Sequence, residues 1–184
     1  EAGWWSTDLP VRYRNRETVP DAPQTWDELK KAALHSVEEG MEGILFNGSR
    51  YEGTTFDWLA NFWGQGGKLV DDQGKPIFGE GDNREKFIKA VNYYRDLVES
   101  GAAPKRVATL GSYDDFNAAA AAGTTALFVG GNWQYAQLKT ALDEDESAKW
   151  TFSPLPGPTA NERSTGTGGW TVAAFSKDAA KVKV

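Results

Sequence analysis

The sequence predicts an α/β fold in which a mixed sheet is flanked by helices on both faces. Short apolar runs of strand length, such as residues 43–46 and 126–129, alternate with longer segments whose apolar residues recur at helical spacing. Glycines or prolines end most of these segments. Alternating strands and helices are typical of α/β domains, and 184 residues can bury a sizeable core. We expect a central sheet of about five strands.

The N-terminal third of the chain contains two predicted strands and a capped helix. Residues 9–14 alternate between apolar and basic side chains, which indicates a strand. Thr25 and Glu28 form a capping box, so a helix is expected from there to about Glu39. The run 43–46 then predicts a short buried strand.

The middle of the chain is mostly helical by pattern. Residues 51–63 predict a helix that is apolar almost all round, which favours a central position with Trp58 and Trp63 in the core. Residues 68–78 predict a small hairpin. Apolar residues at helical spacing then predict a long helix over 82–98.

The last third returns to alternating helices and strands. Residues 112–122 predict an alanine-rich helix, and 126–129 predict a strand that ends at two glycines. Further strands are expected at 150–152 and 170–175. These segments complete the predicted α/β pattern.

The segment after the two glycines is the first candidate site. Asn132 is expected to cap a helix that begins near Trp133, with Tyr135 beside it. Glycines allow a close approach to the backbone, and an aromatic plane beside free N–H groups suits a ring with an apolar face and polar edges, such as a sugar. The alternative is a buried strand followed by a surface helix with a core tryptophan.

Composition excludes several classes of function. The chain has 26 acidic and 20 basic residues, a net charge of −6 and no basic stripe, which argues against nucleic-acid partners. The absence of cysteine excludes disulfides, thiolate zinc sites and thiol catalysis, and His35 is the single histidine. The acidic runs at 71–72 and 143–146 lack the ligand spacing of a calcium loop, so we expect no metal and no cofactor. Eight tryptophans favour an uncharged, ring-shaped ligand or a tryptophan-rich core.

Seven short motifs occur in one order along the chain, at residues 23–29, 51–53 with 66–70, 94–98, 122–127, 131–133, 154–158 and 168–170. In this order they resemble the extracellular solute-binding proteins of ABC sugar importers, in particular the maltose/trehalose-binding group. The resemblance implies one lobe of a periplasmic-binding-protein-like, two-lobed fold. Residues 1–184 would form a single lobe similar to the C-terminal one, with 1–14 and 168–175 as hinge-crossing strands. Members of the family are about twice as long, and their first lobe and closing helices have no counterpart here.

The resemblance also implies sugar contacts. Trp133 matches the stacking tryptophan of that lobe, and Tyr51 with Glu52 match an aromatic and a carboxylate at a helix start. Trp170, after Gly169, matches the late hinge crossing. Further contacts are predicted for Asn132, for Tyr135 and, at the first hinge crossing, for Trp5 or its neighbour Trp4. Packing in the core is the alternative for each aromatic residue.

The implied function is capture of a neutral di- or oligosaccharide in a cleft between two lobes, for delivery to an ABC permease. The implied location is outside the cytoplasm, in the periplasm or lipid-anchored on the cell surface of a bacterium or archaeon. A stand-alone carbohydrate-binding module and a glycoside hydrolase are the alternatives. Hydrolysis needs two carboxyls flanking one bond, whereas Glu52 and Asp57 lie five residues apart on one predicted helix and point in different directions. We therefore expect no enzyme activity. The apolar strand near 172–175 predicts self-association of this chain.

Overall fold

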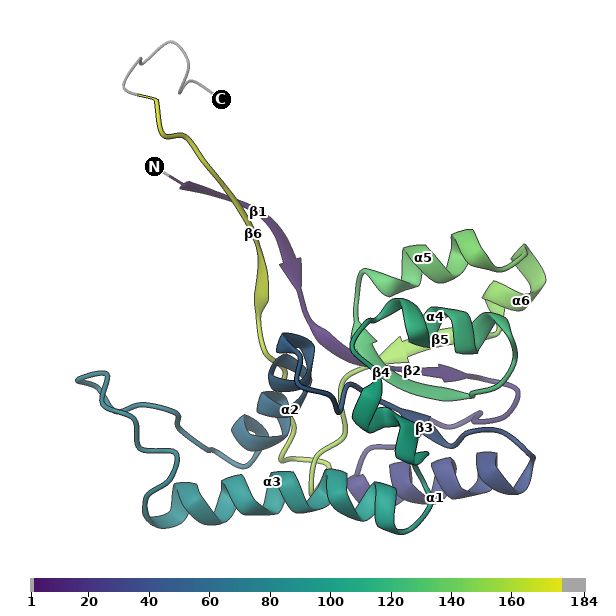
Figure 1. The fold of residues 1–184 in the computed structure, drawn as a ribbon, viewed down its shortest axis with the longest axis horizontal. Helices are drawn as coiled ribbons and strands as arrows, with labels where there is room; N and C mark the ends of the chain where they lie inside the picture. Colours follow the sequence, from purple (N-terminus) through teal and green to yellow (C-terminus); the bar gives the residue numbers. More distant parts are fainter. Residues whose placement is uncertain (1, 177–184) are drawn as a thin grey trace.

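A four-stranded sheet forms the centre of residues 2–176, which are the residues that the computed structural model describes (Figure 1). The order across the sheet is β3 (Ile44–Leu45), β4 (Leu127–Gly131), β2 (Pro10–Asn15) and β5 (Trp150–Ser153). β3 and β4 run parallel, while β2 is antiparallel to both β4 and β5. The predicted mixed sheet is therefore confirmed.

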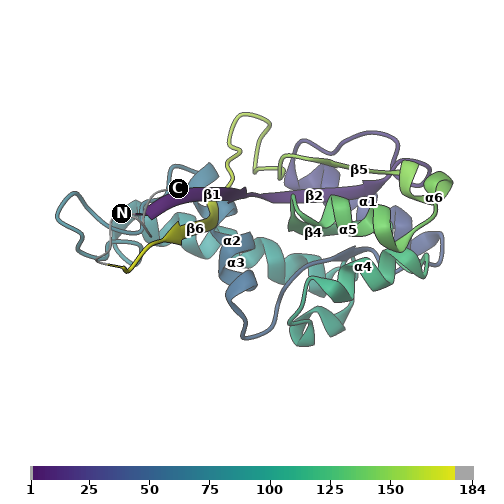
Figure 2. The same ribbon diagram turned by 90° about the horizontal axis from the view of Figure 1, so that it is seen from above.

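The remaining two strands form a separate ribbon. β1 (Ala2–Asp8) pairs antiparallel with β6 (Gly168–Ala173), and a bulge between Trp4 and Ser6 shifts the register. The ribbon extends away from the sheet, and β1 runs almost in line with β2 (Figures 1 and 2). The expectation of about five strands in the central sheet was wrong, because the strand predicted at 170–175 pairs with β1 instead.

Helices cover both faces of the central sheet, as predicted (Figure 1). One side carries α1 (Trp26–Glu38), α2 (Glu52–Gly64) and α3 (Gly81–Glu99). The other side carries α4 (Asp114–Ala121), α5 (Gln134–Ala141) and α6 (Glu144–Ala148), and a short 3-10 turn, η1 (Lys105–Thr109), follows α3. Aromatic pairs pack within these layers: Trp26 of α1 stacks on Tyr93 of α3 at 4.4 Å, and Tyr13 of β2 stacks on Phe128 of β4 at 4.5 Å.

The capping box at the start of α1 is present as predicted. Thr25 Oγ1 accepts a hydrogen bond from the backbone N–H of Glu28 at 3.2 Å, and Glu28 Oε2 accepts one from the N–H of Thr25 at 3.3 Å. These bonds satisfy donors that have no partner inside the helix. The helix begins where this local chemistry places it.

Two expectations for the middle of the chain need correction. Trp58 and Trp63 on α2 are half-buried and lie outside the main core. Trp58 instead packs against Phe87 of α3, with ring centroids 4.7 Å apart. The hairpin predicted over 68–78 contains one bridge, Val70 with Pro76, rather than two strands. Proline has no N–H to extend the pairing.

Candidate ligand-binding cleft

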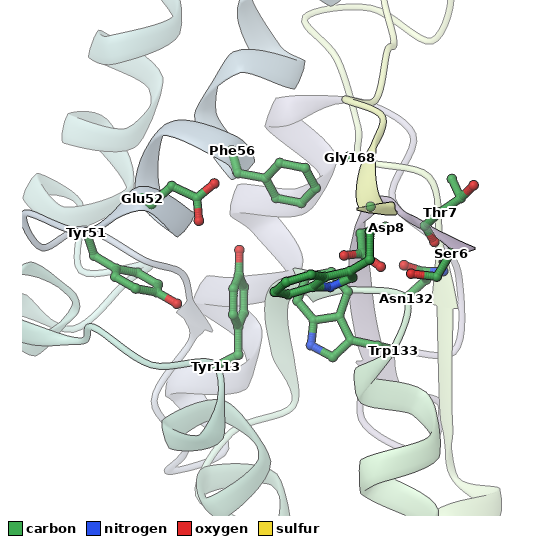
Figure 3. A pocket seen from close by; sticks show the side chains of 12 residues that line it. Ser6, Thr7, Asp8, Tyr51, Glu52, Phe56, Tyr113, Asn132, Trp133 and Gly168 are labelled. Atoms are coloured by element: carbon green, nitrogen blue, oxygen red, sulfur yellow. Dashed lines mark hydrogen bonds between the residues drawn. The ribbon is translucent and has the colours of Figure 1, made fainter. Parts of the chain in front are cut away.

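A cavity of about 850 Å³ lies where α2, α4, the β4–α5 turn and the base of the ribbon meet (Figure 3). Six of its lining residues are predicted site residues: Tyr51, Glu52, Asn132, Trp133, Gly169 and Trp170. They come from three separate segments of the chain, which the fold brings to one place.

Two predicted site residues do not line this cavity. The ring of Tyr135 packs against Phe152 at 5.5 Å, with Lys139 Nζ 5.0 Å from its centroid. Trp5 lies on the ribbon with 76% of its surface exposed. Tyr135 sits on α5 just after Gln134, a buried residue that points inward, so its own side chain takes a different direction.

Six further lining residues had not been predicted, namely Ser6, Thr7, Asp8, Phe56, Tyr113 and Gly168. Phe56 could have been found, because it lies four residues after Glu52 on α2 and therefore on the same helix face. Ser6, Thr7 and Asp8 follow Trp5 in the first predicted hinge strand. This position, next to a predicted site residue, was the sequence signal that could have identified them. Nothing local in the sequence places Tyr113 opposite Trp133.

The indole of Trp133 is held by two other rings. Tyr113 meets it edge to face at 5.1 Å, and Phe56 lies at 6.4 Å. A Cβ atom on Gly131 would lie 1.9 Å from the ring, so glycine at this position makes room for the indole. Trp133 is half-buried and presents its remaining surface to the cavity.

Asn132 does not cap α5, which corrects the expectation for this residue. No side chain caps this helix, and Gln134 Oε1 accepts from the N–H of Gly131 at 2.9 Å. The amide of Asn132 instead binds the other chain segment: Oδ1 accepts from the N–H of Leu9 at 2.9 Å, and Nδ2 donates to the carbonyl of Thr7 at 3.2 Å. The backbone N–H of Asn132 also donates to the carbonyl of Leu9 at 3.0 Å. Asn132 thereby joins the base of the ribbon to the β4–α5 turn, which carries Trp133.

Tyr113 is fixed at both ends. Its backbone carbonyl accepts from Gln134 Nε2 at 3.0 Å, and its hydroxyl donates to Asp57 Oδ1 at 3.1 Å. Burial raises the pKa of the Tyr113 hydroxyl, and the charge of Asp57 raises this pKa further. The hydroxyl therefore stays protonated at any physiological pH.

The two carboxyls of α2 have different surroundings. Glu52 is exposed and lines the cavity, whereas Asp57 is 1% exposed and is hydrogen-bonded to Tyr113 and Asn47. Burial raises the pKa of Asp57 to about 7, although both hydrogen bonds act against this change. These two groups do not form a pair across the cavity, so they lack the arrangement that glycoside hydrolysis needs.

Residues 2–176 contain neither a metal-binding cluster nor a membrane-spanning helix. No group of three histidine, aspartate or glutamate side chains in this part of the chain is placed to hold a metal ion. None of the helices within the described residues is both long and apolar enough to cross a membrane.

The chain thus forms an α/β lobe with a cleft that is lined by aromatic rings, hydroxyls and carboxylates. The model of the bacterial extracellular solute-binding proteins matches residues 4–183. The chain therefore belongs to this family, whose members bind a solute and are not enzymes. The family resemblance seen in the sequence is thereby confirmed.

Individual relatives are about twice as long as this chain. A probable ABC transporter-binding protein of Deinococcus radiodurans is 30% identical, over 95% of this chain and 43% of its own length. The structure of maltose-bound MalE3 of T. maritima is 28% identical with a TM-score of 0.80, and covers 92% of this chain and 44% of that one. The GacH receptor of Streptomyces glaucescens shares the fold, with a TM-score of 0.75 at 24% identity, over 97% of this chain and 45% of its own.

Proposed function

We propose that this chain forms one wall of a carbohydrate-binding cleft in the solute-binding component of an ABC importer. The observation that carries the proposal is the indole of Trp133, braced by Tyr113 and Phe56 beside the free carboxylate of Glu52. A sugar ring offers C–H groups to an aromatic face, while each of its hydroxyls needs a partner once it is buried. A carboxylate can accept hydrogen bonds from two hydroxyls.

The relatives support a neutral saccharide as the ligand. MalE3 is described with maltose bound, and the similarity to it covers nearly all of this chain. The cleft has aromatic rings from α2, the loop before α4 and the β4–α5 turn, and its charged lining residues, Asp8 and Glu52, are both acidic. Acidic side chains disfavour an anionic ligand, so we expect an uncharged di- or oligosaccharide.

Titration of the natural gene product that contains this chain tests the proposal. Tryptophan fluorescence and calorimetry are recorded with maltose, trehalose, a xylo-oligosaccharide and, as a charged control, glucose 6-phosphate. Saturable binding of one neutral sugar, with no response to the phosphate ester, is the expected result. Tight binding of the phosphate ester, with no response to any of the three sugars, would refute the carbohydrate assignment.

The partner and the location belong to the same proposal. The name of the Deinococcus relative supports delivery of the solute to ABC permease subunits in the membrane. We place the protein outside the cytoplasm, in the periplasm or anchored at the cell surface. We assign the ribbon of β1 and β6 as part of the hinge between two lobes, because it leaves the sheet beside the cleft (Figure 1). Copurification of the natural gene product with the permease, by crosslinking in membranes, tests the partner.

The isolated chain is expected to self-associate through the ribbon. Trp5, Trp170 and Phe175 are 76%, 70% and 94% exposed, and apolar side chains gathered in this way favour association. Light scattering of the purified chain should give a mass above that of a monomer. Replacing Trp5 and Phe175 with serine should restore the monomer, whereas Val37→Ser on α1, a residue that is 40% exposed, should change nothing.

A further inference from the structure

A carboxyl group is buried directly behind the cleft with no cation beside it. Asp57 Oδ1 accepts from the Tyr113 hydroxyl at 3.1 Å, and Oδ2 accepts from Asn47 Nδ2 at 2.9 Å. None of the salt bridges found within residues 2–176 involves Asp57. A buried carboxylate that is held by neutral donors alone costs stability. Its hydrogen bond to the cleft runs through Tyr113.

The groups around Asp57 are all neutral or acidic, and they come from four parts of the chain: the β3–α2 loop with Asn47, α2 itself, α3 and the loop before α4. Tyr113 reaches it from the loop before α4, and Glu52 lies one turn earlier on α2. Tyr94 of α3 places its hydroxyl 3.5 Å from the backbone carbonyl of Asp57. Since burial together with the charge of Glu52 raises the pKa of Asp57 to about 7, both charge states are populated near neutral pH.

The hydroxyl of Tyr113 has one proton to donate, and Asp57 decides where that proton points. When Asp57 is ionised, the proton lies on the hydrogen bond to Oδ1, and the tyrosine oxygen offers lone pairs alone to a ligand. A hydrogen bond to a carboxylate also polarises the oxygen and makes it a better acceptor. When Asp57 is protonated, its own O–H can donate to the tyrosine oxygen, and the phenol proton is free to turn outward. In Figure 3 the hydroxyl points toward α2, between Tyr51 and Trp133.

We propose that Asp57 is a positioning residue of the cleft, which orients the Tyr113 hydroxyl so that its oxygen accepts a hydrogen bond from a ligand hydroxyl. The proposal rests on the proposed function, because it takes the ligand to be a sugar. It adds a selection rule to that function: the bound sugar must present a donor at Tyr113. Ionised Asp57 is the state that supports this bond, so binding and ionisation favour each other.

Calorimetry with maltose between pH 5.5 and pH 8.5 tests the proposal on the natural gene product that contains this chain. Affinity of the unsubstituted protein should rise by about tenfold as Asp57 ionises, which corresponds to a shift of one pKa unit on binding. Asp57→Asn and Tyr113→Phe should each remove this rise. Asp145→Asn on the exposed helix α6 carries the same charge change and should retain it. A flat profile for the unsubstituted protein, or an unchanged rise in Asp57→Asn, would overturn the proposal.

A second measurement needs no ligand, and it tests the orientation of Tyr113 by Asp57 separately from the proposed sugar binding. The ring carbon of Tyr113 that carries the hydroxyl, followed by NMR, should titrate with the Asp57 carboxyl and stop doing so in Asp57→Asn. If no sugar binds but Tyr113 still titrates with Asp57, the proposed function fails and the orientation of Tyr113 by Asp57 stands. If the Tyr113 signal is unaffected by Asp57→Asn, the inference is refuted even though sugar binds.

Discussion

The rings of Trp133 and Tyr113 meet edge to face, with centroids 5.1 Å apart and planes at 88°. This geometry places the electropositive edge of one ring against the π face of the other. Tyr113 is itself held by Gln134 and Asp57, so the indole is supported by residues from two helices. The orientation of Trp133 is therefore set before a ligand arrives, which lowers the entropy lost on binding.

Replacing Trp133 with alanine should weaken sugar binding while the fold survives. The ring is half-buried and lines the cleft, so its loss removes a ligand contact in the range of about 2 kcal/mol or more that is typical of hot spots. Calorimetry with the neutral sugar that binds in the titration proposed above measures the change. Trp58→Ala is the matched control, because Trp58 packs on Phe87 outside the cleft and should lower stability but not affinity. Equal affinities for Trp133→Ala and the unsubstituted protein would show that Trp133 packs against its neighbours without contacting the ligand.

The stability of the chain should depend on pH through Asp57. Its folded pKa of about 7 is raised above the unfolded value of 3.8, so its contribution is fully present below pH 3.8 and is lost as pH rises through 7. A difference of about three units corresponds to about 4 kcal/mol, of which about 3 kcal/mol is lost between pH 5 and pH 8.

Urea unfolding at pH 5 and pH 8 measures this loss. Asp57→Asn should abolish it, and Asp145→Asn should leave it in place because Asp145 is exposed. If the free energy of unfolding changes with pH equally in Asp57→Asn and Asp145→Asn, a group other than Asp57 causes the pH dependence.

Gly169→Ala should disrupt the ribbon. Gly169 has φ +141°, and a Cβ atom there would lie 1.9 Å from the backbone oxygen of Ser6. Such strain costs roughly 1–3 kcal/mol, so amide hydrogen exchange in β1 and β6 should speed up by about tenfold or more while α1 remains protected. Gly3→Ala, in the same ribbon, meets nothing within 4 Å and should leave exchange unchanged. Protection that is equal in both variants would contradict the prediction.

The isolated 184-residue chain should bind sugar weakly. It spans 44% of the MalE3 chain and supplies one wall of the proposed cleft, so water keeps access to the bound hydroxyls. We expect a Kd of about 1 mM or weaker for maltose and trehalose, equivalent to about −4 kcal/mol. Calorimetry on the purified chain measures it. Micromolar binding by a monomer would mean that these residues form the complete cleft.

Features set by neighbouring residues were predicted best from the sequence. The capping box of Thr25 and Glu28 depends on residues three apart, and the helix begins there in the structure. The strand predicted at 126–129 is also present, although it does not end at the two glycines: β4 continues through Gly130 and Gly131, which pair with β2. The gathering of Tyr51, Glu52 and Trp133 in one cavity followed from the family resemblance rather than from local pattern.

Features set by distant residues were missed. Asn132 has the chemistry of a helix cap, but its side chain bonds to Leu9, which lies 123 residues away in the sequence. Tyr113 owes its place in the cleft to Asp57, 56 residues away. The pairing of the strand at 170–175 with β1 is not set by periodicity; only the family resemblance, which made both segments hinge-crossing strands, pointed to a place outside the central sheet.

The bonds made by Asn132 decide where the ribbon can bend. Thr7 and Leu9 are tied to the turn that carries Trp133, whereas the pairing of β1 with β6 is interrupted at the bulge between Trp4 and Ser6. We therefore expect the ribbon to bend at the bulge, next to Ser6, which itself lines the cleft. Residues 7–9 should then keep their place beside Trp133, while residues 2–4 move.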